Sequence, residues 1–136
     1  MKRLTFSGGW PLALFAAAGL VSSVQAATPA ELLAGYVAQA GAAASPERGQ
    51  QFFTANRKNA LNLTCVSCHG ATPTGPGRHD LTDKRIAPLA PAFNKERFTD
   101  AKKTDGWFKT NCLDVVGRDC TAQERADVLS WLMTLK

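Results

Sequence analysis

The sequence predicts one small all-α domain. Capping boxes at residues 28–31 and 121–124 mark two helix starts, and apolar residues recur at helical spacing after each box. From about residue 59 to residue 91 the chain is rich in Gly, Pro and polar residues and shows little periodicity, which is typical of a loop rather than a strand. We therefore expect helices toward both ends of the chain and few or no strands.

The first expected helix starts at Thr28, which can form a capping box with Glu31, and has Pro29 at its first position. It runs to about Ala40 and ends at Gly41. Apolar residues of this segment fall on one face, namely Leu32, Leu33, Tyr36, Val37 and Ala40. Such a face has to be buried against another element.

Two further helices follow from start signals of the same kind. Ser45-Pro46-Glu47 begins a helix that carries Gly49 and the pair Phe52-Phe53. Thr121 caps the last helix, whose apolar positions are Val128, Leu129, Leu132 and Leu135. The helix near residue 28 is thus an additional N-terminal element ahead of the other two.

The first 26 residues have the three parts of a secretory signal. Lys2 and Arg3 precede an apolar run over residues 10–21, and Val24-Gln25-Ala26 is a small-residue cleavage site. The run holds roughly a dozen residues, whereas a membrane-spanning helix needs about 20. We expect cleavage after Ala26, a mature domain over residues 27–136 without a membrane span, and export to the periplasm.

The most specific motif is Cys65-Val66-Ser67-Cys68-His69. A C-x-x-C-H sequence attaches a c-type haem, because its two thiols bond the porphyrin and the adjacent imidazole coordinates the iron. We expect one covalent haem c on Cys65 and Cys68, with His69 as an axial iron ligand.

Charge gives little support for a nucleic-acid partner. The chain has 16 Lys and Arg against 11 Asp and Glu, and loss of Lys2 and Arg3 with the signal lowers the net charge from +5 to +3. Two haem propionates would lower it further, to about +1. We expect no nucleic-acid binding.

Cys112 and Cys120 are the two remaining cysteines. In an oxidising compartment they are expected to form a local disulfide, for which the chain-entropy estimate is roughly 2.5 kcal/mol. Two free structural thiols and a four-cysteine zinc site are the alternatives. The zinc site would leave His69 unexplained and has a single C-x-x-C half.

The arrangement resembles the class I cytochrome c fold. Gly49 and Phe53 precede the haem motif on one helix, and Trp131-Leu132 lie on the last helix. In that family the two helices cross closely with the glycine at the contact, so a side chain at position 49 would hold them apart.

A strong sixth iron ligand is not evident. Met133, the only methionine besides Met1, belongs to the terminal helix, and His79, the only other histidine, lies in a Gly- and Pro-rich loop. Leu89 lies between two prolines, where a ligand could reach the iron, but it has no lone pair. An iron with a weak or missing sixth ligand is open to O2, NO or CO.

A closer resemblance covers about residues 29–135, to the sphaeroides haem protein (SHP) family of c-type cytochromes. The segments that carry it are Ile86–Pro91, Arg97–Asp100, Trp107, Asn111-Cys112, Val116–Cys120 and Trp131-Leu132. The resemblance implies a high-spin haem with a disulfide beside the distal pocket. It also implies that Asn111 binds ferric iron and swings away on reduction, and that a di-haem cytochrome c and a membrane cytochrome b supply electrons.

Several side chains are expected around the porphyrin. Those proposed for the haem pocket are Phe53, Leu89, Phe93, Phe98 and Trp107, and Arg85 or Arg118 could pair with a propionate.

Three functions compete at this point. The first is electron transfer with binding of a diatomic ligand at the reduced iron. The second is a plain low-spin electron carrier that uses Met133 or His79 as sixth ligand. The third is a haem enzyme that acts on NO, peroxide or a sulfur compound; whether the protein is an enzyme stays open.

Overall fold

The computed structural model describes residues 26–57 and 59–136. The signal predicted for residues 1–26 lies outside this part except for Ala26. The described elements are α1 (Pro29–Ala40), α2 (Pro46–Thr54), α3 (Cys65–His69), β1 (Gly77–Arg78), β2 (Arg85–Ile86), α4 (Ala101–Val116) and α5 (Ala122–Leu132). The all-α prediction is confirmed, because the strands in the described part of the chain form only a two-residue antiparallel pair, in which Gly77 faces Ile86.

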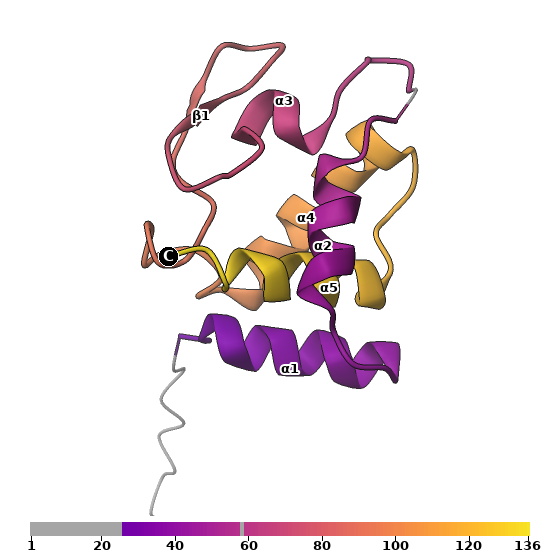
Figure 1. Ribbon diagram of the computed structural model, residues 1–136, viewed down its shortest axis with the longest axis vertical. Coiled ribbons are helices and arrows are strands. Elements are labelled where there is room, and N and C mark those ends of the chain that lie inside the picture. The colour runs from indigo at the N-terminus through magenta and orange to yellow at the C-terminus, as the bar shows by residue number, and fades with distance from the viewer. Residues whose placement is uncertain (1–25, 58) are drawn as a thin grey trace, which may run out of the picture.

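Helix α1 has the predicted bounds and covers α5 at the base of the molecule (Figure 1). Its capping box is complete: the Thr28 hydroxyl accepts from the Glu31 amide, and the Glu31 carboxylate accepts from the Thr28 amide. Gly41 ends the helix with a φ of 67°, a left-handed conformation that favours glycine. Leu32 and Tyr36 are the buried residues of its apolar face.

Helices α2 and α5 cross at Gly49, as the resemblance to the class I cytochrome c fold implies. A Cβ built on Gly49 would overlap the backbone carbonyl of Asp127 and lie 2.9 Å from the Val128 nitrogen. The buried Asp127 carboxylate accepts hydrogen bonds from the Ser45 amide and the Arg48 guanidinium, which fixes the start of α2 on α5. The crossing therefore has no room for a side chain at position 49.

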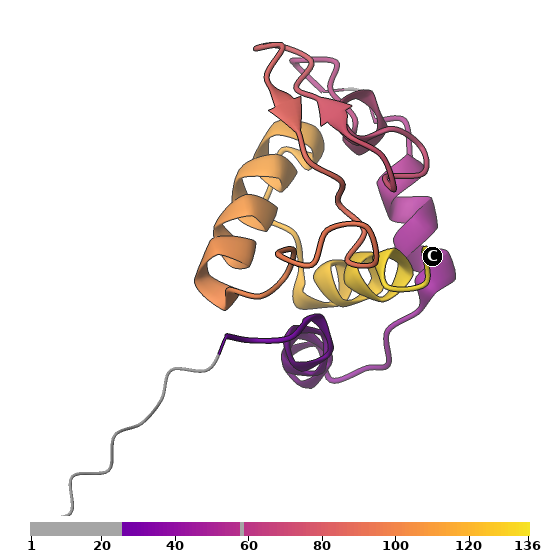
Figure 2. The ribbon, with the colours of Figure 1, turned by 90° about the vertical axis from the view of Figure 1, so that its left-hand side faces the viewer.

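Helix α4 is an element that the sequence reading did not predict. The Asp100 side chain accepts from the Lys103 amide at its start, and Gly117 ends it with a φ of 76°. In Figure 2, α4 lies on one side of the molecule and α2 and α3 on the other, and the segment joining β2 to α4 runs between them above α5. These elements surround the candidate functional site.

The core lies where α1, α2 and α5 meet. Phe53 and Trp131 pack with ring centroids 5.0 Å apart, and Leu129 and Leu132 are fully buried. Among the described residues, no helix combines the length and apolar character that crossing a membrane requires.

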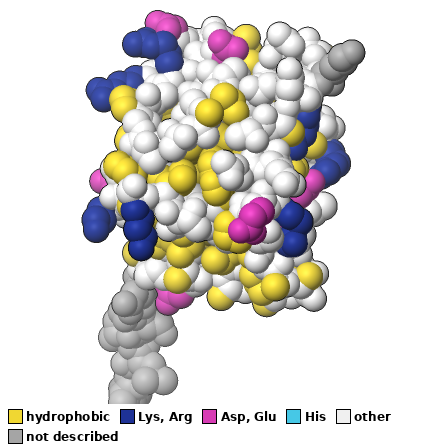
Figure 3. All heavy atoms as spheres, viewed as in Figure 1, with side chains coloured by type: hydrophobic (Ala, Val, Ile, Leu, Met, Phe, Trp, Pro, Cys, Tyr) yellow, Lys and Arg dark blue, Asp and Glu magenta, His cyan; other side chains and the backbone are white. Residues whose placement is uncertain are grey.

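The face seen in Figure 3 carries hydrophobic side chains between polar groups. Its Lys and Arg side chains are spread along both margins with Asp and Glu among them. This face of the described chain thus has no continuous basic patch of the kind that binds nucleic acid.

Candidate haem site

Helix α3 spans the five residues of the haem motif and carries its two cysteines and its histidine. The Thr64 hydroxyl accepts from the Ser67 amide at 3.0 Å, and the Ser67 hydroxyl accepts in return from the Thr64 amide at 3.2 Å. Cys65 and Cys68 are free thiols and both are partly buried. The capping box thus presents both thiols and His69 from one short, well-defined helix.

The hairpin after α3 packs directly against it. A Cβ on Gly77 would overlap the backbone carbonyl of Cys68, so only glycine allows this approach. The Asp80 amide lies 3.3 Å from the Cys68 sulfur, to which it donates a hydrogen bond. These contacts bring His79 and Arg85 to the edge of the same site.

A cavity of about 790 Å³ opens beside α3. Both motif cysteines and His69 line it, together with residues of α2, β2, the segment before α4, α4 and α5. Its apolar walls include Leu89, Phe98, Val128 and Leu132. The volume lies within the range of about 300–1,000 Å³ that is usual for ligand and cofactor pockets.

His69 is held in its neutral form. Burial lowers its pKa from 6.5 to about 4, and the positive charge of Arg97 acts in the same direction. A neutral imidazole keeps a lone pair for a metal, so the electrostatics of the cavity favour iron coordination. Burial likewise raises the pKa of the Cys65 thiol, although the charge of Arg57 opposes this effect.

One face of α4 forms the wall contributed by that helix. The residues that line the cavity from it include Thr104, Trp107, Phe108, Asn111, Cys112 and Val115. The Asn111 side chain is exposed toward the cavity, and within the described residues nothing hydrogen-bonds to its amide. Asn111 and His69 therefore line one cavity from two different helices.

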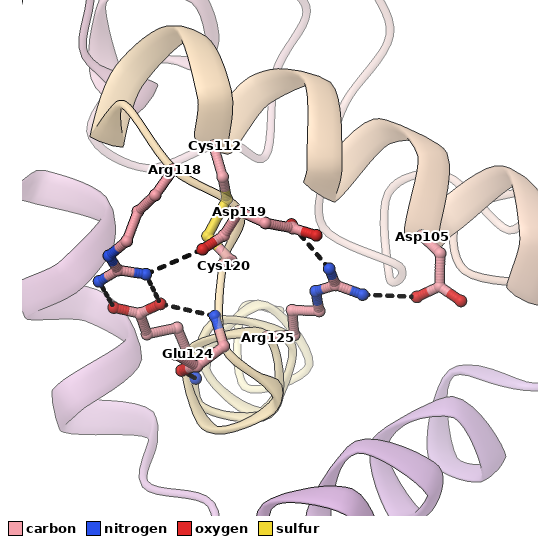
Figure 4. Close-up of a disulfide and its surroundings, with 8 residues drawn as sticks. Asp105, Cys112, Arg118, Asp119, Cys120, Glu124 and Arg125 are labelled. Atoms are coloured by element: carbon pink, nitrogen blue, oxygen red, sulfur yellow. Dashed lines mark hydrogen bonds and ion pairs between the residues drawn. A yellow bond between two sulfur atoms is a disulfide. The ribbon is translucent and has the colours of Figure 1, made fainter.

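The predicted disulfide is present between Cys112 and Cys120, with their Cα atoms 5.6 Å apart. Figure 4 shows it beside Arg125, which donates to Asp105 on α4 at 3.1 Å and to Asp119 at 2.7 Å. The alternatives of free thiols and of a four-cysteine zinc site at these positions are thus wrong. The bridge ties the end of α4 to the loop before α5, and Arg125 links α5 to that loop and to the first half of α4.

The residues predicted for the haem pocket divide into two groups. Phe53, Leu89, Phe98 and Trp107 line the cavity, and Phe98 does so with a φ of 60°, a conformation that bulky residues rarely adopt. Phe93 is not among the lining residues, and 49% of it is exposed. Its predicted place in the haem pocket therefore stays a prediction.

The candidate propionate partners also divide. Arg85 lines the cavity, but Arg118 forms an ion pair with Glu124 at 2.7 Å and is not part of the lining. Sequence reasoning gave no role to Arg97, which lines the cavity and donates to the carbonyl oxygens of Pro88 and Ala87. The only signal for Arg97 in the sequence was that it belongs to Arg97–Asp100, one of the segments that carry the resemblance to the SHP family.

The two alternative sixth ligands differ in position. Met133 packs at the end of α5 against the core and does not line the cavity, whereas His79 does. The amides of Leu81 and Thr82 both donate to Nδ1 of His79 at 3.3 Å. An imidazole that accepts at Nδ1 carries its proton on Nε2 and has no lone pair there for a metal.

The residues present fit a covalent haem. Two thiols and a neutral imidazole on α3 face a cavity of suitable volume with apolar walls, which are the groups and surroundings that haem c requires. They could hold the porphyrin, coordinate its iron and shield it from water.

Known proteins match both the sequence and the fold. Residues 39–132 match a family model described as a domain of unknown function, DUF1924. The cytochrome c-type protein SHP of Cereibacter sphaeroides is 47% identical over 107 residues, which cover 77% of this chain and 82% of SHP. Cytochrome c'' of Methylophilus methylotrophus is 39% identical over 90 residues, which cover 63% of this chain and 61% of that protein.

Solved structures agree with these relatives. The structure of oxidised SHP, described as an oxygen-binding cytochrome c, matches with a TM-score of 0.76 and 44% identity over 80% of this chain and 98% of SHP. Crystalline oxidised cytochrome c'' gives a TM-score of 0.72 at 33% identity, over 79% of this chain and 94% of that one. The fold is thus the class I-like, all-α cytochrome c fold, and the chain belongs to the SHP family of c-type cytochromes, which carry covalently bound haem c.

Proposed function

We propose that this protein is an exported cytochrome that transfers electrons and binds a diatomic ligand such as O2 or NO at its reduced iron. The haem is attached through Cys65 and Cys68, and His69 is the permanent axial ligand. When bound, the haem supplies an iron that changes charge and has a coordination position for a small molecule. The description of SHP as an oxygen-binding cytochrome c supports this proposal.

Asn111 is the proposed sixth ligand of the oxidised protein. The observation that carries this proposal is that Asn111 and His69 line one cavity, while Met133 does not line it and His79 has its Nδ1 occupied as an acceptor. An amide oxygen is a weak, hard donor that tolerates ferric iron better than ferrous iron. Asn111 would therefore leave the position on reduction and open it to the diatomic ligand.

The cellular setting belongs to the same proposal. A signal over residues 1–26 and a mature domain over 27–136 would send the chain to the periplasm, where the Cys112–Cys120 disulfide can persist. A di-haem cytochrome c and a membrane cytochrome b are the electron donors that the family resemblance implies.

Absorption spectra of the oxidised, reduced and CO-exposed holoprotein test the proposal. Wild-type protein should bind CO readily when reduced, and Asn111→Ala should change the ferric spectrum while CO binding is kept. Thr110→Ala is the matched control, because Thr110 is an exposed neighbour on α4 outside the cavity lining. Reduced protein that does not bind CO, or an N111A ferric spectrum equal to that of T110A, would overturn it.

A closed, low-spin electron carrier remains the second candidate because His79 lines the cavity. It predicts low-spin spectra in both oxidation states, which His79→Ala changes and Asn111→Ala leaves alone. The hydrogen bonds at Nδ1 of His79 argue against it, and the same set of spectra separates the two functions.

A further inference from the structure

Four cationic side chains line the haem cavity: Lys84, Arg85, Arg97 and Lys103. Three of them are exposed, and such side chains keep their charge in water at little cost. Arg97 is the partly buried member of the set. Because burial of a charge is costly unless the charge is paired, Arg97 needs an explanation that the other three do not.

Two hydrogen bonds hold the Arg97 guanidinium in one place. Its Nε donates to the Pro88 carbonyl at 3.0 Å, and its Nη2 donates to the Ala87 carbonyl at 2.8 Å. Asn94 donates to the same Pro88 oxygen at 3.3 Å. These bonds orient the guanidinium against the segment before α4 and leave the hydrogens of Nη1 without a partner among the described residues.

Among the described residues, the charge of Arg97 has no counter-ion. Glu96 and Asp100 also line the cavity, but within the described chain no carboxylate forms an ion pair with Arg97. Burial accordingly lowers the pKa of Arg97, and its positive charge contributes to the lowered pKa of His69. A fixed, unneutralised cation thus faces the space that the porphyrin fills.

We propose that Arg97 binds a haem propionate, as the counter-ion that fixes the porphyrin in the cavity. A propionate carries the negative charge that Arg97 lacks, and the planar guanidinium suits a carboxylate. The inference rests on the covalent haem and is independent of any role of Asn111. Arg97 is in this sense a cofactor-positioning residue.

Two other arginines compete for this role. Arg85 lines the cavity but is exposed, and no hydrogen bond within the described chain orients its side chain. Arg57 stacks on Phe52, with its guanidinium carbon 4.2 Å from the ring centroid. Its buried Nη1 finds no hydrogen-bond partner among the residues that the structure describes. Arg57 is not among the lining residues, so Arg97 is the arginine that combines burial, orientation and access to the cavity.

Resonance Raman spectra of the holoprotein test the assignment, because the propionate bending mode reports hydrogen bonding to that group. Arg97→Gln should shift this mode to lower frequency and lower the reduction potential, since loss of a nearby positive charge favours ferric iron. Arg85→Gln is the matched control and should leave the mode in place with a smaller change of potential. Arg97→Lys should keep most of the potential but still shift the mode, because an ammonium lacks the planar fork.

The assignment fails if the mode stays in place in R97Q, or if it moves in R85Q or Arg57→Gln instead. If the R97Q protein does not mature with haem, the R97K variant tests the assignment by itself. An unshifted propionate bending mode in R97K then overturns the assignment. The ferric spectrum of N111A tests the sixth ligand separately, so failure of one proposal is distinguishable from failure of the other.

Discussion

Replacement of Gly49 by alanine should destabilise the protein, although alanine is the better helix former. The added Cβ would overlap the Asp127 carbonyl and approach the Val128 nitrogen to 2.9 Å. Both are backbone atoms of α5, so no side-chain rotation can relieve the overlap. The two helices would have to move apart, and the Phe53–Trp131 packing beneath the crossing would loosen with them.

The magnitude follows from two opposing terms. Overpacking of a tight contact costs typically 1–3 kcal/mol, and we take about 3 kcal/mol because backbone must move. Alanine recovers about 1 kcal/mol through its helix propensity. We expect Gly49→Ala to lower the free energy of unfolding by about 2 kcal/mol.

Gly35 supplies the matched control. It lies within α1, and a Cβ built on it meets nothing within 4 Å. Gly35→Ala should therefore gain the propensity term alone and raise the free energy of unfolding by about 1 kcal/mol. The opposite signs separate close packing from helix propensity.

Guanidinium unfolding of the oxidised holoprotein, followed by haem absorbance and far-ultraviolet circular dichroism, measures both variants. Equal m-values for the variants and the wild type would show that the free energies are comparable. A G49A variant as stable as the wild type would refute the close crossing of α2 and α5.

Two further predictions concern the links that α5 and its preceding loop make to other helices. Removal of the disulfide by the double change Cys112→Ala and Cys120→Ala should lower the free energy of unfolding by about 2.5 kcal/mol in guanidinium titrations, since the bridge closes a short loop, and an unchanged midpoint would contradict this. Asp127→Asn should cost about 1–3 kcal/mol at neutral pH, because it weakens the bonds from Arg48 and the Ser45 amide. Burial acts to raise the Asp127 pKa, but hydrogen bonds from Arg48, Ser45 and Gln123 outweigh it and hold the pKa below 3.8. This contribution to stability is present above pH 3.8 and is lost as the pH falls through the lower pKa that Asp127 has in the folded protein. The difference in unfolding free energy between wild type and D127N should therefore close in strongly acidic solution. A difference that does not change with pH would exclude the ionised Asp127 as its source.

Local signals explain what the sequence could predict. Thr28 and Glu31 are three residues apart, so their reciprocal hydrogen bonds depend on no distant part of the fold, and the same holds for Thr121 and Glu124. The C-x-x-C-H motif is likewise complete within five residues. These features predicted α1, α5 and the haem motif before any packing was known.

Helix α4 was missed because its inward face contacts the cofactor cavity rather than an apolar core. Polar Thr104 and Asn111 share that face with Trp107, so the apolar spacing that marks a core-facing helix is interrupted. Asp100 as N-cap and Gly117 beyond the end were the remaining signals. A helix face that lines a cofactor cavity therefore lacks the regular apolar spacing of a helix face that packs in an apolar core.

The positions of side chains in the segment before α4 were beyond prediction for a different reason. The turn that contains Phe93 and the bonds of Arg97 to Ala87 and Pro88 depend on how that segment folds back on itself, and no local motif records this. Likewise, Arg118 pairs with Glu124 only because the disulfide loop returns the chain to α5. Residue type alone could not show that Arg97 lines the cavity and Arg118 does not.

A displaceable ligand requires a fixed backbone and a free side chain, and α4 combines the two at neighbouring residues. Cys112 is covalently tied to Cys120, and Arg125 links Asp105 on the same helix to Asp119. The Asn111 amide, one residue before the bridge, is exposed to the cavity and has no hydrogen-bond partner in the described chain. If Asn111 binds ferric iron as proposed, its departure would break no bond within the protein and would need only a side-chain rotation. Return of the side chain would likewise need only a rotation, because the disulfide ties the backbone at the neighbouring Cys112.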